Sequence, residues 1–469
     1  MRYFLDPFGC VKNQVDAENM MAHLNAAGWE STDDSQSADL IIVNSCGFIE
    51  SAKQESINAV LQWRQFYPGK KILLAGCLYQ RYAKELPELL TEADGFMGVN
   101  NPAEIVSIAN KITKKRKSKT AVSPNSTGER PLLSLPGSAY VKISEGCSNN
   151  CSYCAIPLIR GSLVSRSIPD ILQECKTLLK RGIKELCIIA QDTGSYENGL
   201  RVLLEAISKL KGNFWLRLLY IHPDHFPLQI LDIMERDSRF LPYFEIPFQH
   251  ASEKILTAMN RKGSKDRYLK LIKTIRNRLP NAVIRSTFML GFPGETDEDF
   301  DTLLDFQKKA KLDWLGCFTF SREEGTSAYS MKGRVPVKTA NLRKKIIEEK
   351  QIPITEKNMD RFIGQEFDVL LEERITAKNT KNTKNAKNAK NAEGAQGAQG
   401  AQETKDTEDT QSTQDTQSGG SIWLGRLFCQ APDIDGSTVI INGNNLQAGT
   451  LVKCKVTARH GFDLEVRII

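Results

Sequence analysis

Short apolar runs alternate with longer segments of helical periodicity over residues 1–112. The predicted strands are 3–9, 40–44, 72–76 and 95–99, and the predicted helices are 13–27, 50–66, 81–90 and 102–112. Strands that alternate with helices in this way predict a parallel sheet covered by helices on its faces. We therefore expect an N-terminal parallel α/β domain over residues 1–112.

The same alternation returns over residues 139–358. Its predicted strands are 140–144, 185–190, 215–220, 244–248, 283–290 and 314–320. Helical segments separate these strands, as at 169–181 and 296–311. Six strand–helix units predict a partial (β/α)6 barrel of the TIM type, a fold whose functional residues cluster at the carboxyl ends of the strands.

The last part of the chain, 364–469, has shorter segments with period-two alternation. These segments are 367–375, 422–428, 438–442, 452–456 and 464–468, and they predict a small antiparallel β-barrel. Between the first two lies the low-complexity stretch 376–420, which lacks large apolar side chains and is expected to be a disordered insertion. A lysine run within 113–138 predicts a solvated linker.

Composition narrows the class of protein. With 41% hydrophobic residues the chain can bury a core, yet it has no apolar run long enough to span a bilayer. No signal peptide opens the sequence, so a cytoplasmic location without a membrane partner is expected. Eleven cysteines in such a chain favour metal-binding or catalytic thiols over disulfides. The net charge of +7 permits a nucleic-acid partner without requiring one.

Cys147, Cys151 and Cys154 form a C-x3-C-x2-C cluster just after the first predicted barrel strand. Three thiols this close cannot all point into an apolar core, and they are one short of a closed tetrahedral metal site. A cubane iron–sulfur cluster held by three cysteines would leave one iron free for a substrate or cofactor. The alternative is a zinc site with a fourth ligand from elsewhere, which would make the chain a zinc-bound RNA-binding protein.

Three further cysteines, Cys10, Cys46 and Cys77, each fall just past the end of a predicted N-terminal strand. Parallel sheets bind ligands at the carboxyl ends of their strands, so these thiols could converge on one point. Three unrelated buried thiols remain the alternative, because free cysteine is a common core residue. The remaining cysteines match no ligand spacing and are expected to be core or surface thiols: Cys175, Cys187, Cys317, Cys429 and Cys454.

A second candidate binding element directly follows the predicted strand 283–290. It consists of Gly291, Phe292, Pro293, Gly294 and Glu295. Its glycines would let the backbone approach a ligand closely, although Pro-Gly is also an ordinary turn. His250 follows another predicted strand and is compatible with either a structural or a functional role.

The spacing of Cys147, Cys151 and Cys154 is that of the radical S-adenosylmethionine (SAM) enzymes, which the chain resembles here. Runs at 9–13, 44–48, 76–77 and 160–161 extend the likeness, and the chain is similar to the radical SAM methylthiotransferases along its length apart from 376–420. The resemblance implies that the three cysteines hold a 4Fe-4S cluster that binds SAM, and that residues 291–295 lie beside SAM.

The same resemblance implies that Cys10, Cys46 and Cys77 hold a second 4Fe-4S cluster, whose open iron carries the sulfur that is transferred. One SAM would supply the methyl group and another the radical. An electron donor such as flavodoxin or ferredoxin and a separate sulfur donor are then expected as partners.

The family has two branches, one modifying an adenosine in tRNA and the other an aspartate of a small-subunit ribosomal protein. The terminal segment resembles the TRAM module, which binds RNA in the first branch. Acidic residues outnumber basic ones in this segment outside 376–420, which suits a basic ribosomal protein better than phosphates. Runs at 189–193, 321–326 and 431–436 resemble the protein-modifying, RimO-type branch. The expected substrate is therefore the β-carbon of an aspartate in the twelfth small-subunit protein, with tRNA as the alternative.

Overall fold

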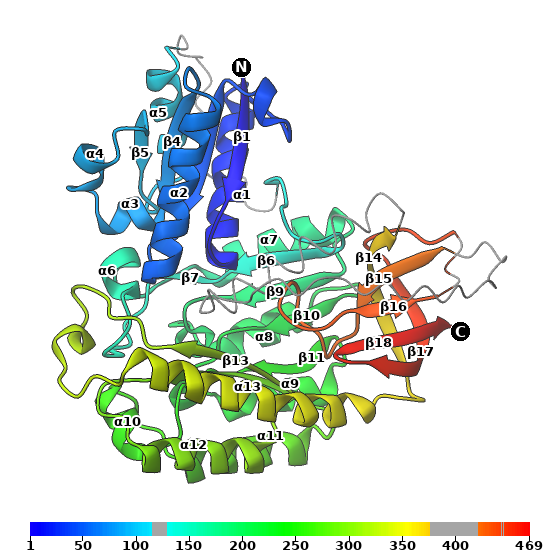
Figure 1. The fold of residues 1–469 in the computed structure, drawn as a ribbon. Coiled ribbons are helices and arrows are strands. Elements are labelled where there is room, and N and C mark those ends of the chain that lie inside the picture. Colours follow the sequence, from blue (N-terminus) through cyan, green and yellow to red (C-terminus); the bar gives the residue numbers. More distant parts are fainter. Residues whose placement is uncertain (115–128, 376–420, 442, 444) are drawn as a thin grey trace, which may run out of the picture.

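The computed structural model of the chain describes residues 1–114, 129–375, 421–441, 443 and 445–469. These residues form an N-terminal α/β unit, a central α/β unit and a C-terminal barrel (Figure 1). The expected insertion 376–420 and residues 115–128 of the expected linker lie outside the described residues. Within the described ranges, none of the helices has the length and apolar character needed to cross a membrane.

The N-terminal unit is a five-stranded parallel sheet in the order β2-β1-β3-β4-β5. Its strands are β1 (Arg2–Pro7), β2 (Glu30–Ser31), β3 (Leu40–Ser45), β4 (Lys71–Gly76) and β5 (Gly95–Met97). Its helices are α1 (Val11–Ala26), α2 (Glu50–Phe66), α3 (Cys77–Arg81), α4 (Leu86–Leu89) and α5 (Glu104–Ile112). β3 is buried along its whole length because α1 and α5 pack on one face of the sheet while α2 and α4 pack on the other.

One predicted N-terminal helix is wrong. The expected helix 81–90 is two short helices, α3 and α4, separated by a turn. Pro87 has no backbone N–H and could not bond to the preceding turn of a continuous helix, but it fits the first turn of α4. The short edge strand β2 was not predicted, since two residues carry no period-two signal.

The central unit is a six-stranded parallel sheet in the order β13-β12-β11-β10-β9-β6. Its strands are β6 (Ser138–Lys142), β9 (Glu185–Ile189), β10 (Trp215–Leu218), β11 (Phe240–Glu245), β12 (Val283–Leu290) and β13 (Trp314–Thr319). Consecutive strands pair in parallel, and β6 and β13 are the two edges, so the expected partial barrel is confirmed.

Helices follow the central strands. They are α6 (Ile156–Arg160), α7 (Ile168–Lys180), α8 (Leu200–Ser208), α9 (Leu231–Arg236), α10 (Glu253–Ala258), α11 (Lys265–Arg278), α12 (Asp297–Ala310) and α13 (Val337–Asp360). A small antiparallel ladder joins β7 (Ser144–Glu145) to β8 (Val164–Ser165). Short 3-10 helices lie at η1 (Ser35–Ser37), η2 (Thr193–Ser195), η3 (Pro223–His225), η4 (Leu228–Ile230) and η5 (Ser327–Ser330).

The expected strand 244–248 is displaced, since β11 begins at Phe240 and ends at Glu245. Pro242 lies inside β11, and a proline within an apolar run argues against a strand. The structure accommodates it at an irregularity, because the β10–β11 register shifts between Leu216 and Leu218. Pro242 therefore occupies a position where no regular ladder bond is needed.

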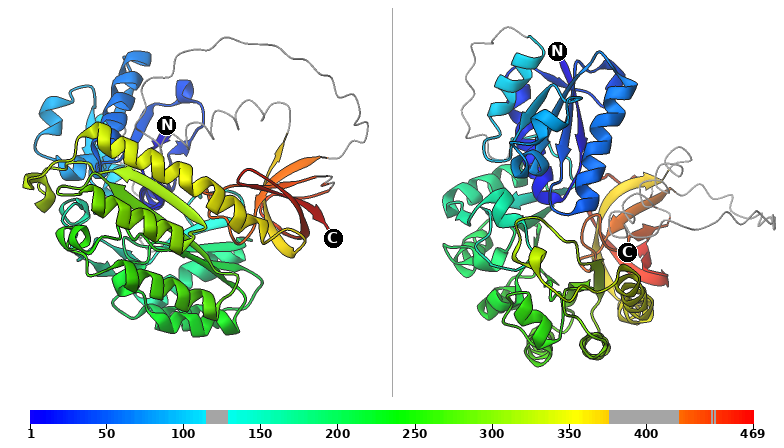
Figure 2. Two further views of the ribbon diagram at one scale, coloured as in Figure 1. Left: turned by 60° about the horizontal axis from the view of Figure 1, so that its bottom comes forward. Right: turned by 60° about the vertical axis from the view of Figure 1, so that its left-hand side comes forward.

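The C-terminal unit is a closed five-stranded barrel in the order β14-β15-β16-β18-β17. Its strands are β14 (Glu366–Ile375), β15 (Ile422–Arg426), β16 (Thr438–Ile440), β17 (Leu451–His460) and β18 (Asp463–Ile468). The expected small barrel is confirmed, and one of its five pairings, β16 with β18, is parallel instead of antiparallel. In the views of Figure 2, the barrel stands beside the central unit, and the N-terminal unit lies against another side.

Candidate active site

The loop that carries Cys147, Cys151 and Cys154 is closed at its base. The ladder of β7 and β8 brackets the loop, and the Cys147 amide donates to the Gly161 carbonyl at 3.1 Å. Gly146 is left-handed (φ +70°), and a Cβ there would lie 2.1 Å from the Ser162 carbonyl oxygen. The three thiols are half-buried, and they lie beyond the carboxyl ends of the central strands, as the barrel rule predicts.

The carbonyl groups at the end of α10 hold the cysteine loop by hydrogen bonds. The Ser152 amide donates to the Met259 carbonyl at 3.1 Å, and its hydroxyl donates to the Ala258 carbonyl at 2.8 Å. Buried Arg261 brings its Nη1 to 4.0 Å from the Cys151 sulfur. Arg261 thus places a positive charge beside a sulfur that would bind iron as a thiolate.

Asp192, which follows β9, holds the other side of the loop. Its buried carboxylate accepts hydrogen bonds from the Asn149 amide at 2.9 Å and the Ser195 hydroxyl at 2.6 Å. The His225 ring lies 2.8 Å away, and the His222 backbone amide donates at 3.1 Å. Burial alone would raise the pKa of Asp192, but these hydrogen bonds outweigh it and hold the pKa well below its usual range. The sequence placed Asp192 only within the run 189–193 that resembles the protein-modifying branch, and it assigned this residue no role of its own.

The thiols of the cysteine loop raise one another's pKa. Burial raises the pKa of Cys147, and it raises the pKa of Cys154 to about 12, with the neighbouring thiols adding to both shifts. Without iron these two groups are therefore protonated at neutral pH, and a metal would displace their protons.

The structure also brings Cys10, Cys46 and Cys77 together at one end of the N-terminal sheet. Cys10 caps α1, Cys46 follows β3, and Cys77 opens α3. Burial and the nearby Cys10 thiol together raise the pKa of Cys46 to about 12 and that of Cys77 to about 11, although Arg160 lowers both. A Cβ on Gly9 would lie 3.3 Å from the Cys46 Cβ, which shows how closely these loops approach.

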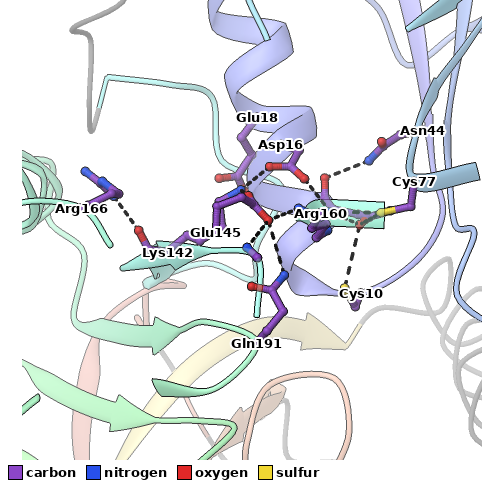
Figure 3. Close-up of polar contacts among 12 residues, drawn as sticks. Cys10, Asp16, Glu18, Asn44, Cys77, Lys142, Glu145, Arg160, Arg166 and Gln191 are labelled. Carbon is purple, nitrogen blue, oxygen red and sulfur yellow. Dashed lines mark hydrogen bonds and ion pairs between the residues drawn. The ribbon is translucent and has the colours of Figure 1, made fainter. Parts of the chain in front are cut away.

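Arg160 links Cys77 to Glu145, which precedes the other group of cysteines (Figure 3). It ends α6, six residues after Cys154, and is 5% exposed. Its Nη2 donates to the Cys77 sulfur at 3.2 Å, to Asn13 Oδ1 at 2.7 Å and to Asp16 Oδ2 at 2.8 Å. Its Nη1 donates to Glu145 Oε1 at 2.7 Å, two residues before Cys147.

The contact between the two cysteine groups is also apolar. Ala155, just before α6, and Ile159, within α6, pack on Cys77, with Phe48 against them. Lys142 adds a second bridge, since it pairs with Asp16 of the N-terminal unit and with Glu145 at 2.5 Å. Cys77 and the segment that follows Cys154 therefore meet at the interface between the N-terminal and central units.

The segment from Gly291 to Glu295 lies just past β12, as expected. The Glu295 side chain turns inward, where it accepts from the Gly291 amide at 2.7 Å and from Arg343 Nη1 at 2.7 Å. Phe292 is fully buried and packs against Phe320. Gly291 and Pro293 line a cavity of about 210 Å³. The backbone and the proline, rather than the carboxylate, are thus the parts of this segment that a ligand could reach.

His250 is fully buried behind this segment. Its Nδ1 accepts from the Ser252 amide at 3.0 Å, so its Nε2 carries the proton and lies 3.9 Å from Glu295 Oε2. Burial lowers the pKa of His250 to about 3. The ring therefore supports the Glu295 turn as a neutral side chain.

The structure also places the other residues that the sequence pointed to. The five remaining cysteines are all buried: Cys175, Cys187, Cys317, Cys429 and Cys454.

The 431–436 turn is more than a polar loop, because Asp435 accepts from Tyr243 at 2.7 Å and from Arg285 at 2.6 Å on the central sheet. Arg130, inside the expected linker, is buried against Glu18 and Glu174. The sequence could not predict that Arg130 is buried, because its partners Glu18 and Glu174 lie far from it along the chain.

The two cysteine groups suit iron–sulfur clusters by donor type and surroundings. Within the described ranges, no three His, Cys, Asp or Glu side chains lie close enough together to hold a single metal ion. A four-iron cluster is larger than one ion and is held at its corners by thiolates. Each group supplies three thiols, and each has a buried arginine at a sulfur, Arg261 at Cys151 and Arg160 at Cys77.

Three protein-family models match the chain. They are the uncharacterized protein family UPF0004 at residues 2–98, the radical SAM superfamily at 141–306 and the TRAM domain at 413–469. The TRAM match begins after β14, although β14 closes the barrel. Membership of the radical SAM superfamily implies a 4Fe-4S cluster and SAM.

Full-length relatives carry the family assignment further. The ribosomal protein uS12 methylthiotransferase RimO of Treponema denticola is 45% identical, with 98% of this chain and 99% of the relative covered. That of Syntrophomonas wolfei is 37% identical, with 97% of each chain covered. Among solved structures, the radical SAM methyltransferase TsrM from Kitasatospora setae has a TM-score of 0.52 at 14% identity over 70% of this chain and 76% of its own, a likeness of fold. The chain belongs to the RimO family of radical SAM methylthiotransferases and is a SAM-dependent enzyme.

Proposed function

We propose that the chain adds a methylthio group to the β-carbon of an aspartate in ribosomal protein uS12, using SAM and two 4Fe-4S clusters. The full-length relatives are named for uS12, which favours this substrate over the tRNA alternative. The observation that carries the two-cluster reaction is the Arg160 guanidinium, which contacts Cys77 of one thiol group and Glu145 beside the other.

Cys147, Cys151 and Cys154 would hold the cluster that binds SAM. When bound, that cluster supplies the electron that cleaves SAM and so permits hydrogen abstraction from an unactivated carbon. The protein's part is positioning. Asn149, Ser152 and the Gly161 carbonyl fix the loop, while Arg261 balances thiolate charge at Cys151.

Cys10, Cys46 and Cys77 would hold the second cluster. Two features of this chain place positive charge at its sulfurs. Cys10 lies at the amino end of α1, where the helix dipole is positive, and Arg160 donates to Cys77. Hydrogen bonds to a ligand sulfur also tune a cluster's potential, so Arg160 would act on the second cluster directly.

Segment 291–295 would lie beside SAM and contact it through its backbone. Gly291 and Pro293, which line the cavity, would make this contact, whereas Glu295 is occupied by Arg343 and by the amides of Gly291 and Phe292. We also propose the domain bounds 1–112, 139–358 and 364–469, which the separate sheets and the barrel support. A cytoplasmic location, a flavodoxin or ferredoxin electron donor and a separate sulfur donor complete the proposal.

The test is turnover by anaerobically reconstituted, reduced protein offered either unmodified uS12 or unmodified tRNA. We expect 5′-deoxyadenosine and a methylthio mass increment on uS12 only, followed by mass spectrometry. Modified tRNA with untouched uS12 would overturn the substrate assignment.

Cysteine variants test the cluster assignment separately. Cys10→Ala should lose the iron of the second cluster while still cleaving SAM, and Cys147→Ala should lose SAM cleavage. The matched control is Cys454→Ala, a buried barrel thiol, which should keep the full iron content. Full iron in Cys10→Ala would contradict the second cluster.

A further inference from the structure

Lys12 is a buried cation at the junction of the three units. It is the second residue of α1, two positions after Cys10, and is 7% exposed. The charged groups that act on it are Cys10, Glu245, Arg160 and Glu145. In the described part of the chain, neither a hydrogen bond nor an ion pair engages its ammonium group. A buried lysine in that state is costly unless something else offsets its charge.

The aromatic ring of Tyr220 holds the Lys12 ammonium in place. Nζ lies 2.9 Å from the ring centroid. Tyr220 follows β10 in a left-handed conformation (φ +61°), which is strained for a bulky residue. Its carbonyl accepts from the Thr193 amide at 3.0 Å, which keeps the backbone there. A cation–π contact positions an ammonium without neutralising it, so Lys12 can still attract an anion.

Two buried acceptors of the central unit, one of them on Glu245, which acts on Lys12, also lack hydrogen-bond partners among the residues that the structure describes. Glu245, at the end of β11, is 7% exposed, and its Oε2 is buried without a hydrogen bond; its Oε1 lies 3.7 Å from Arg285. Gln191, which follows β9, has a buried and unbonded Oε1, while its amide points to Glu145 at 3.5 Å. Buried acceptors of this kind need N–H donors.

The cation and the two acceptors without partners are together complementary to one kind of ligand. Among the described residues, the cation has no carboxylate within hydrogen-bonding distance, and the two acceptors lack the N–H groups that a peptide backbone supplies. An aspartate within an extended peptide offers both, whereas an adenosine offers no carboxylate. The position of Lys12 also suits this ligand, because the charges of Cys10 and Glu145 both act on Lys12. Cys10 belongs to one thiol group, and Glu145 lies two residues before Cys147 of the other.

We propose that Lys12 binds the carboxylate of the substrate aspartate, an inference that rests on the proposed function. The β-carbon is one bond from that carboxylate, so fixing the carboxylate places the reacting carbon between the two thiol groups. A charge-assisted contact of this kind also separates aspartate from asparagine. Lys12 is thus a residue that determines substrate specificity.

The test measures binding of unmodified uS12 and of its variant with asparagine at the target position, to reconstituted protein without SAM. Wild type should bind the aspartate form about tenfold more tightly, the effect expected of one charged hydrogen bond. Lys12→Met should bind the aspartate form as weakly as the asparagine form and leave the asparagine form unchanged. Equal weakening of both forms, or a retained preference, overturns the inference.

Two further variants sharpen the test. Lys12→Arg keeps a cation of different shape, so it should retain the preference for aspartate but lower kcat more than it raises KM. Lys70→Met is the matched control, because Lys70 also lies over a tyrosine ring, 4.7 Å from Tyr67, at the opposite end of the N-terminal sheet. It should leave the preference intact. If wild type modifies uS12 but Lys12 variants keep the preference, only this inference fails; if wild type modifies no uS12, the proposed function fails.

Discussion

At the scale of single residues, the interface between the two thiol groups depends on buried charge. Arg160 is nearly inaccessible, and it is the only guanidinium that the described residues place against both Asp16 and Glu145. Lys142 pairs with the same two carboxylates. Removing one partner of such a network leaves buried charge uncompensated, which destabilises far more than losing an exposed pair does.

We predict that Arg160→Met lowers the free energy of unfolding of the iron-free protein by about 3 kcal/mol, since Lys142 alone must then serve both carboxylates. The measurement is urea denaturation followed by circular dichroism. The control is Arg278→Met, a surface arginine whose side chain is 31% exposed and pairs with Asp232 and Glu235, which should change stability by less than about 1 kcal/mol. Equal losses in the two variants would show that the Arg160 network carries no special weight.

At the scale of elements, hydrophobic periodicity predicted most strands and helices because each buries a regular face. It failed where one proline decided the outcome, at Pro87 and Pro242, since the cost of a proline depends on which neighbouring strand or turn needs its missing N–H. It predicted where the thiols lie, after strand ends. It could not predict the partners of Lys12 or Arg160, which come from segments hundreds of residues or another unit away.

The loops after β3 and β4 meet so closely that a side chain at Gly47 has no room. A Cβ there would lie 2.6 Å from the Cys77 carbonyl oxygen, with backbone rather than a flexible side chain in the way. We predict that Gly47→Ala costs about 1–3 kcal/mol of stability and separates Cys46 from Cys77. Iron content after reconstitution should fall, because the proposed second cluster needs both thiols.

Gly69→Ala is the matched control for Gly47→Ala, because nothing lies within 4 Å of a Cβ built at Gly69. Its stability should change by no more than about 0.5 kcal/mol and its iron content should match wild type. An unchanged iron content in Gly47→Ala, despite lower stability, would contradict the placement of the second cluster at these loops.

At the scale of the whole molecule, the barrel and the central sheet share one core. A single apolar cluster contains Tyr140, Trp215 and Trp314 of the sheet together with Leu370 and Trp423 of the barrel. Charge reinforces this contact. The fully buried Glu185 of β9 accepts from Arg426 of β15 at 2.6 Å and from Arg217 of β10 at 2.7 Å. The two units should therefore unfold together instead of separately.

Glu185→Gln tests that cooperativity, because it keeps the shape of the side chain and removes the charge between two arginines. Burial alone would raise the pKa of Glu185, but Arg426 and Arg217 lower it to about 2. Because the folded pKa is depressed, the carboxylate's contribution is complete above its unfolded pKa, about 4.5, and is lost as pH falls toward 2. At pH 7 the variant should lose about 3 kcal/mol.

The difference between wild type and Glu185→Gln should shrink below pH 4.5, whereas Glu349→Gln, at an exposed pair with Lys345, should match wild type throughout. Hydrogen exchange distinguishes joint from separate unfolding. If the barrel and the central sheet unfold together through their shared core, amides of β14–β18 and of β6–β13 lose protection by the same amount in the variant. If barrel amides alone become labile while the central sheet stays protected, the barrel is an independent unit, and its contact with the sheet cannot be what fixes Asp435 and Arg285 beside the proposed substrate site.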